Sequence, residues 1–136
     1  MGGKVSTGEV HDTVEKHSKM FRDLMLGFVR VHILHHANKG PVYGSGISVE
    51  LERHGYRISW GTLYPVLHNL TDEGFLVRQD RVVGGKVRKY YRITPLGRRA
   101  LQGARDKALE LIDEITEDEI LVGGSRIGTA PREHAR

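Results

Sequence analysis

The sequence contains no cysteine. This absence excludes disulfide bonds and thiolate metal sites, and it is typical of proteins of the reducing cytoplasm. Long apolar runs are absent too, since no segment approaches the ~18 apolar residues of a membrane-spanning helix. The first residues, MGGKVSTGEVHDTVEKHSK, lack the apolar segment of a secretory signal. We therefore expect a cytoplasmic protein that does not contact a membrane.

Acidic residues are scarce in one short segment. Residues 75–93 contain six bases and one acid, a net charge of +5, whereas the remainder has 15 bases and 16 acids, a net charge of −1. The six bases are Arg78, Arg81, Lys86, Arg88, Lys89 and Arg92. A basic excess confined to one segment favours contact with a polyanion over a merely solvated surface.

Catalytic patterns are also missing. No nucleophile, base and orienting residue occur at an informative spacing, and Gly84-Gly85 is typical of a hairpin turn rather than of a phosphate-binding loop. We expect neither an enzyme nor a bound cofactor.

Apolar spacing predicts the order helix, helix, helix, hairpin, helix. The first helix begins near Met20 and ends near Asn38, and the second, capped by Ser45 or Ser48, closes at His54-Gly55. The third runs from Ser59 to about Asp72. The last begins with Thr94 as its cap and Pro95 at its first helical position. The prediction is a mainly α fold with a small β hairpin, namely a winged helix-turn-helix plus a C-terminal helix. The ranges are a flexible or helical extension (1–18), the winged helix-turn-helix (19–94), a dimerisation helix (95–122) and a disordered tail (123–136).

The third helix has an unusual outer face. In SWGTLYPVLHNLTDEGFL, residues 59–76, one side is apolar and the other carries hydroxyl, amide and imidazole groups that suit base edges in a major groove. We therefore predict that helix 59–72 enters the major groove and that wing 75–93 contacts the backbone or the minor groove. The predicted DNA-binding residues are Ser45, Ser48, Ser59, Trp60, Gly61, Thr62, Tyr64, His68, Asn69, Lys86, Arg88 and Lys89. A winged helix used for protein interaction is the alternative, and it would need an apolar outer face.

Three segments form a recognisable combination: GPVYGSGIS at 40–48, ISWGTLYPVLHNLTDEGFL at 58–76 and GGKVRKYYRITPLGRRAL at 84–101. Together they resemble the PadR family of bacterial transcriptional regulators. The resemblance covers about residues 20–116 and corresponds to the family's short branch with a single C-terminal helix. It implies a homodimeric repressor that binds a palindromic operator in double-stranded DNA and that a small molecule can release.

Dimerisation is also expected on physical grounds, because the long C-terminal helix has one apolar stripe and few partners in so small a domain. The predicted interface residues are Phe21, Leu24, Phe28, Leu101, Ala104, Ala108, Leu111, Ile112 and Ile115. No effector can be named from the sequence, and Phe28 and His32 are the candidates for contacting one. The C-terminal helix lacks aromatic residues, which argues against capture of a flat aromatic compound there.

Three histidines follow one another at helical spacing. His32, His35 and His36 lie at i, i+3 and i+4, so a metal-responsive regulator that uses His32 and His36 is a further alternative. Because no cysteine or carboxylate is clearly placed beside them, the preferred interpretation is ordinary helix-end or interface histidines. We expect no metal.

Overall fold

The computed structural model describes residues 18–122, with side chains described up to residue 118. Most of the predicted N-terminal extension and all of the predicted tail lie outside these residues. The described elements are α2 (Lys19–Lys39), β1 (Val42–Tyr43), α3 (Gly44–Arg53), α4 (Trp60–Asp72), β2 (Leu76–Val83), β3 (Lys86–Ile93) and α5 (Pro95–Val122). The chain divides into two compact units, one ending at Leu101 and one beginning at Gln102.

A capping side chain and two glycines set three of the helix ends. Ser18 caps α2, since its Oγ accepts a hydrogen bond from the Phe21 N–H at 3.1 Å. Gly55 and Gly74 follow α3 and α4 with φ of +87° and +84°, the left-handed conformation that glycine adopts without strain.

The predicted cap of the second helix is wrong. Neither Ser45 nor Ser48 caps α3, because Tyr43 occupies the N-cap position and contributes no side-chain hydrogen bond. Tyr43 also belongs to β1, whose residues pair with β3, so the chain passes directly from a strand into the helix. Strand β1 is not predictable from the sequence, since two residues are too few to show strand periodicity.

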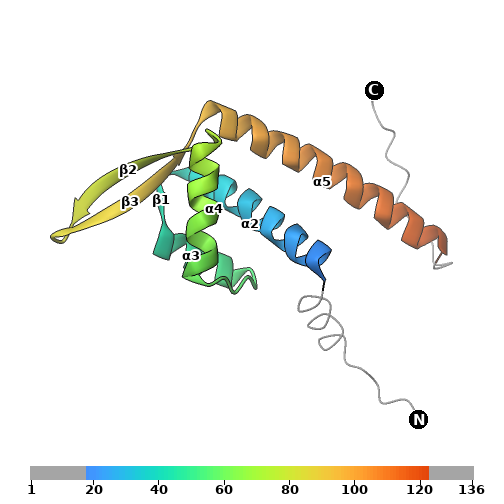
Figure 1. Ribbon diagram of the computed structural model, residues 1–136. Coiled ribbons are helices and arrows are strands. Elements are labelled where there is room, and N and C mark those ends of the chain that lie inside the picture. Colours follow the sequence, from blue (N-terminus) through green and yellow to red (C-terminus); the bar gives the residue numbers. More distant parts are fainter. Residues whose placement is uncertain (1–17, 123–136) are drawn as a thin grey trace, which may run out of the picture. The chain divides into compact units, whose positions relative to one another are not determined.

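The strands form an antiparallel sheet in the order β1-β3-β2. Strands β2 and β3 pair over eight residues, from Leu76 opposite Ile93 to Val83 opposite Lys86. Gly84 and Gly85 connect them with φ of +58° and +79°, as a type I′ hairpin turn requires. Figure 1 shows this hairpin projecting from the helices as a long wing.

The core of the first unit lies between α2, α3, α4 and the base of the sheet. Its buried residues are Val29, Ile33, Leu34, Ala37, Ile47, Leu51, Leu63, Val66, Leu67, Leu70, Leu76, Tyr91 and Ile93. Ala100 and Leu101 pack against this cluster from the start of α5. Helix α4 is therefore packed against this core on one side and exposed on the other.

The junction between the wing and α5 is closely bonded. Thr94 Oγ1 donates to the Gly74 carbonyl at 2.6 Å and accepts from the Gly97 N–H at 3.0 Å. Thr94 thus caps α5 as predicted and ties its first turn to the end of α4. A Cβ at Gly97 would overlap the carbonyl oxygen of Phe75, so only glycine fits at this crossing.

The architecture confirms the predicted fold class: a mainly helical protein with a small antiparallel sheet, arranged as a winged helix. Strand β1 extends the predicted two-stranded hairpin to a three-stranded sheet. Among the described residues, no helix combines the length and the apolar character needed to cross a membrane.

Candidate nucleic-acid interface

Helix α4 has two chemically distinct faces. Leu63, Val66, Leu67 and Leu70 are buried. The predicted contact residues lie on the other side, where Ser59, Trp60, Gly61, His68 and Asn69 are exposed and Thr62 and Tyr64 are partly exposed. The structure therefore gathers seven predicted contact residues on one solvent-facing surface.

The start of α4 leaves its backbone end open. Ser59 is the N-cap residue, but its hydroxyl makes no capping bond and lies instead 3.1 Å from the Thr62 hydroxyl. Exposed N–H groups at a helix N-terminus favour an anion such as a phosphate. Gly61 brings no side chain to this end, and a Cβ there would meet only the Ser59 hydroxyl, at 3.9 Å.

Pro65 and His68 modify the outer face further along α4. Pro65 lies inside the helix and is exposed. His68 Nε2 lies 3.2 Å from an Asp72 carboxylate oxygen, and both side chains are largely exposed. The Asp72 carboxylate therefore competes with any outside partner for His68 Nε2.

Tyr64 joins the recognition helix to the wing. The Lys89 ammonium on β3 donates a hydrogen bond of 2.7 Å to the Tyr64 hydroxyl and lies 4.6 Å from the centroid of the Tyr64 ring. This bond lowers the pKa of the Tyr64 phenol, because a cationic donor stabilises the phenolate. Lys89, predicted as a free wing cation, is thus engaged with the protein.

On the face of the wing opposite Lys89, arginine side chains lie over tyrosine rings. The Arg88 guanidinium lies 4.5 Å from the centre of the Tyr43 ring, and the Arg81 guanidinium 5.0 Å from that of Tyr90. The two tyrosine rings pack edge to face at 5.6 Å. Planar guanidinium groups on aromatic faces are well oriented for phosphate oxygens. Lys86, towards the tip, is exposed.

The one acid of the wing is neutralised within the protein. Arg78 donates two hydrogen bonds to the Asp80 carboxylate, at 2.9 and 3.1 Å. These bonds lower the pKa of Asp80, so the carboxylate stays ionised and paired. The cations that remain, five in number, are Arg81, Lys86, Arg88, Lys89 and Arg92.

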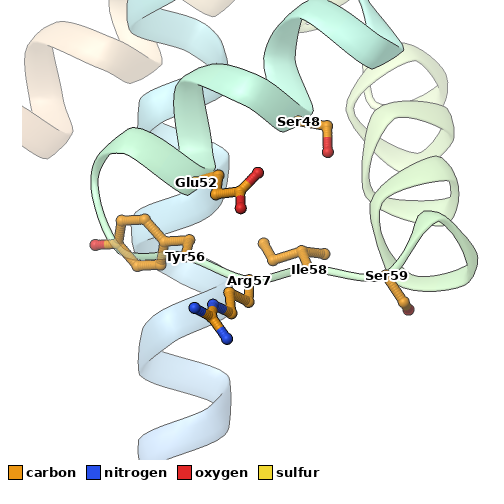
Figure 2. A pocket seen from close by; sticks show the side chains of 6 residues that line it. All are labelled: Ser48, Glu52, Tyr56, Arg57, Ile58 and Ser59. Carbon is orange, nitrogen blue, oxygen red and sulfur yellow. The ribbon is translucent and has the colours of Figure 1, made fainter.

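The two serines of α3 that were predicted to contact DNA differ in exposure. Ser45 is exposed, whereas Ser48 is half-buried and faces an open cleft of about 350 Å³. Figure 2 shows Ser48 and Glu52 of α3 on one side of this cleft and the segment from Tyr56 to Ser59 on the other. Glu52 and Arg57 line the cleft with opposite charges. Ser45 is the better placed of the two serines because it is the exposed one.

The predicted interface residues differ in exposure. In the first unit, Leu24 and Phe28 are exposed on α2, Phe21 is half-buried, and Leu101 packs against the core. In the second unit, Ala104 is half-buried and Ala108 is exposed, and exposed apolar side chains on α5 are Leu109, Leu111, Ile112 and Ile115. Of the two candidates for contacting an effector, Phe28 is open to solvent, while His32 belongs to a packed aromatic cluster.

That cluster joins α2 to the end of α3. The His32 ring stacks on His54 with centroids 4.8 Å apart and meets Tyr56 edge to face at 5.2 Å. Burial is the main factor that lowers the pKa values of His32 and His36, and the neighbouring histidines lower them further. Both rings are therefore held in the neutral form.

Three residues of these surfaces were not predicted from the sequence. Tyr43 and Arg81 form part of the aromatic-cationic face, and His54 completes the histidine cluster. Alternation along β3 could have placed Arg81 through its partner Arg88, which lies directly opposite. Tyr43 depends on the pairing of β1 with β3, and His54 depends on how α3 packs on α2, and neither relationship has a local sequence signal.

Comparison with known proteins gives consistent matches. The model of the transcriptional regulator PadR-like family matches residues 33–103. Transcriptional regulator Rv3488 of Mycobacterium tuberculosis is 50% identical over 94 residues, which cover 69% of this chain and 88% of that protein.

Solved structures agree with these matches. A PadR family transcriptional regulator from Eggerthella lenta superposes with a TM-score of 0.66 at 30% identity, covering 79% of this chain and 94% of its own. The structure of Bacillus subtilis PadR in complex with operator DNA gives a TM-score of 0.52 at 28% identity. That match covers 56% of this chain and 46% of the other.

Proposed function

The chain belongs to the transcriptional regulator PadR-like family, and from this premise we propose that it binds double-stranded operator DNA as a homodimer and represses transcription. The observation that carries the proposal is the joining of two surfaces. The polar outer face of α4 is linked through Tyr64 and Lys89 to a wing with a net charge of +5. Operator DNA bound to the Bacillus subtilis relative supports the same class of partner.

The two surfaces have separate roles in this proposal. The α4 side chains Thr62, Tyr64, His68 and Asn69 read base edges in the major groove, where hydroxyl, amide and imidazole groups match donors and acceptors. The wing cations contact phosphates, which adds affinity without sequence information. The open N-terminus of α4 at Ser59 and Gly61 takes a further phosphate.

Dimerisation through α5 explains its exposed apolar side chains. Leu111, Ile112 and Ile115 expose about half of their surface or more, and an isologous contact with a second copy would bury them. A twofold dimer presents two α4 helices to half-sites about one helical turn apart, so the operator is a palindrome. Residues 19–94 form the DNA-binding part and residues 95–122 the dimerisation helix.

Repression follows from occupancy of the promoter. The dimer blocks transcription sterically in the cytoplasm and carries out no chemistry of its own. An effector would act by changing the spacing of the two α4 helices, since both must fit the groove together.

The proposal is tested by fluorescence anisotropy with mixed genomic duplexes across a salt series. The triple variant Arg81→Ala/Lys86→Ala/Arg88→Ala removes wing cations while leaving the Lys89–Tyr64 contact intact. Each lost phosphate contact lowers the slope of log K against log salt by about 0.9, so the slope should fall by about 2 to 3. Lys107→Ala, on α5 and exposed, is the control and should leave the slope unchanged. Absence of binding at low salt, or equal slopes for wild type and triple variant, would contradict the proposal.

A further inference from the structure

Two side chains one helical turn apart on α2 face the end of α3. His32 and His36 lie at i and i+4, and the C-cap residue of α3, His54, stacks on His32 with ring centroids 4.8 Å apart. One ring nitrogen from each of the three histidines lies within 4.8 Å of the other two. Such a convergence of three imidazoles from two elements separates this cluster from ordinary helix-end histidines.

We propose that His32, His36 and His54 form a binding site for a divalent transition-metal ion of the zinc type. Imidazole nitrogen is a preferred ligand of Zn²⁺, Ni²⁺ and Cu²⁺, whereas Mg²⁺ and Ca²⁺ prefer oxygen. Three histidines plus one open position is an established ligand set for zinc.

The distances require only a small adjustment. Nitrogens bound to one zinc ion at about 2.0–2.1 Å in a tetrahedral site lie about 3.3 Å from each other. The present separations reach at most 4.8 Å, so each nitrogen must approach a common centre by less than about 1 Å. Side-chain torsions can supply such a shift without moving either helix, because His54 is exposed.

One imidazole nitrogen of His36 lacks a hydrogen-bond partner among the described residues. This nitrogen, Nε2, is buried. A buried polar atom without a partner is costly, and native structures rarely tolerate one. A metal ion bound through Nε2 would give this nitrogen a partner.

The protonation state and the access route fit the same role. Metal ions bind neutral imidazole, the form that burial favours at His32 and His36. His54 lies at the surface and opens the cluster to solvent. The remaining position would take water or the carboxylate of Glu50, which lies one helical turn before His54 on α3 and influences His36 electrostatically. Glu50 now pairs with Arg53 at 3.3 Å.

A bound ion would fix α2 to the residue at which the chain turns from α3 towards α4. Only Gly55 and the segment Tyr56–Ile58 separate His54 from the N-cap of α4. Metal occupancy would therefore restrict the turn of the helix-turn-helix. This regulatory consequence rests on the proposed DNA binding, whereas the site itself does not.

The test uses the untagged full chain, freed of metal by a chelator and titrated with Zn²⁺ in competition with a chromophoric chelator. We expect one ion per chain, bound in the presence of excess Mg²⁺. His54→Gln and His36→Gln should each weaken binding at least tenfold, a loss already seen when only a supporting partner of a metal site is removed. His35→Gln, the exposed neighbour on α2, is the matched control and should bind as the wild type does.

Circular dichroism on each variant shows whether the fold is kept. If His36→Gln unfolds, the zinc affinity of His54→Gln, which alters an exposed residue, is still compared with that of the wild type. Equal zinc affinity in wild type and His54→Gln would overturn the proposal by placing the ion elsewhere, as would failure of the wild type to bind Zn²⁺. Loss of DNA binding, measured separately, would affect the proposed function and leave the zinc result unchanged.

Discussion

Lys89 and Tyr64, 25 residues apart in the sequence, form a bond between the wing and the recognition helix. The Lys89 ammonium donates a 2.7 Å hydrogen bond to the Tyr64 hydroxyl and lies over the same ring. The contact spans two elements whose relative orientation decides whether both can meet one duplex. It therefore orients the wing before DNA arrives, which lowers the ordering cost of binding.

The Lys89–Tyr64 bond predicts an order of tyrosine titration. Tyr64 has a lowered pKa, while burial raises the pKa values of Tyr56 and Tyr91, so Tyr64 should ionise first among these three. Because the folded state lowers this pKa, the pH-dependent part of the stabilisation is complete above the unfolded value of about 10 and is lost as pH falls through the folded pKa. Lys89→Met should return the Tyr64 pKa towards about 10. NMR titration of labelled tyrosine rings measures this, and an unchanged Tyr64 pKa in Lys89→Met would show that the bond is not formed in solution.

Replacing Gly97 with alanine should destabilise the protein. In Gly97→Ala the new methyl group would overlap the Phe75 carbonyl oxygen and lie 2.7 Å from Ile93 Cγ1. Forced overpacking of this kind costs about 1–3 kcal/mol in the free energy of unfolding. In the control, Gly103→Ala on the same helix, the new methyl meets nothing within 4 Å, and stability should rise by about 0.5–1 kcal/mol. Chemical denaturation of both variants measures the difference, and equal stabilities would contradict the packing described for Gly97.

Replacing Gly44 with alanine should change the fluorescence of Trp60, the one tryptophan of the chain. The indole lies against Gly44, and an added Cβ would come within 2.6 Å of its Cζ3 atom, so Gly44→Ala must displace the ring into solvent. Emission should move to longer wavelength, with a stability change within about 1 kcal/mol because alanine also favours the helix. Gly40→Ala, where the new methyl meets nothing, should leave the emission unchanged. An unshifted spectrum in Gly44→Ala would count against this contact.

The proposed dimer predicts a charge-sensitive association through α5. Ile112→Glu removes about 1.5–3 kcal/mol of apolar burial from each copy, and symmetry doubles the loss. The dissociation constant should therefore rise at least about 100-fold, since 1.4 kcal/mol corresponds to a factor of ten. Sedimentation velocity measures the change, with Gln102→Glu as a control that adds the same charge at another exposed position of the helix. Unaltered association of Ile112→Glu would exclude this face of α5 as the interface.

Much of the fold could be predicted because its signals are local. Helical spacing, the Thr94-Pro95 start of α5 and the Gly84-Gly85 turn each depend on a few neighbouring residues, and the structure confirms all three. The exposed polar face of α4 was predictable for the same reason, since it is the complement of an apolar stripe on one helix.

The relationships between elements could not be predicted. Lys89 and Arg88 both read as free cations in the sequence, yet strand alternation directs Lys89 to Tyr64 and Arg88 to Tyr43. The sequence places His54 only at a helix end, because its approach to His32 depends on the packing of α3 on α2. Contact partners that are far apart in the chain leave no periodic pattern in the sequence, so the sequence alone does not reveal them.

The wing's outer strand bears on the solubility of the free protein. Strand β2 is an edge of the sheet, and β1 covers only the base of β3, at Tyr90 and Tyr91. Towards its tip the hairpin therefore offers unpaired backbone groups on both sides, among the exposed apolar side chains Val82, Val83 and Val87. Such edges invite strand-to-strand aggregation, and like charges placed along them are a common defence. Arg81 and Arg88 lie opposite each other across the strands. Their like charges would oppose pairing between copies of the wing when no DNA is present.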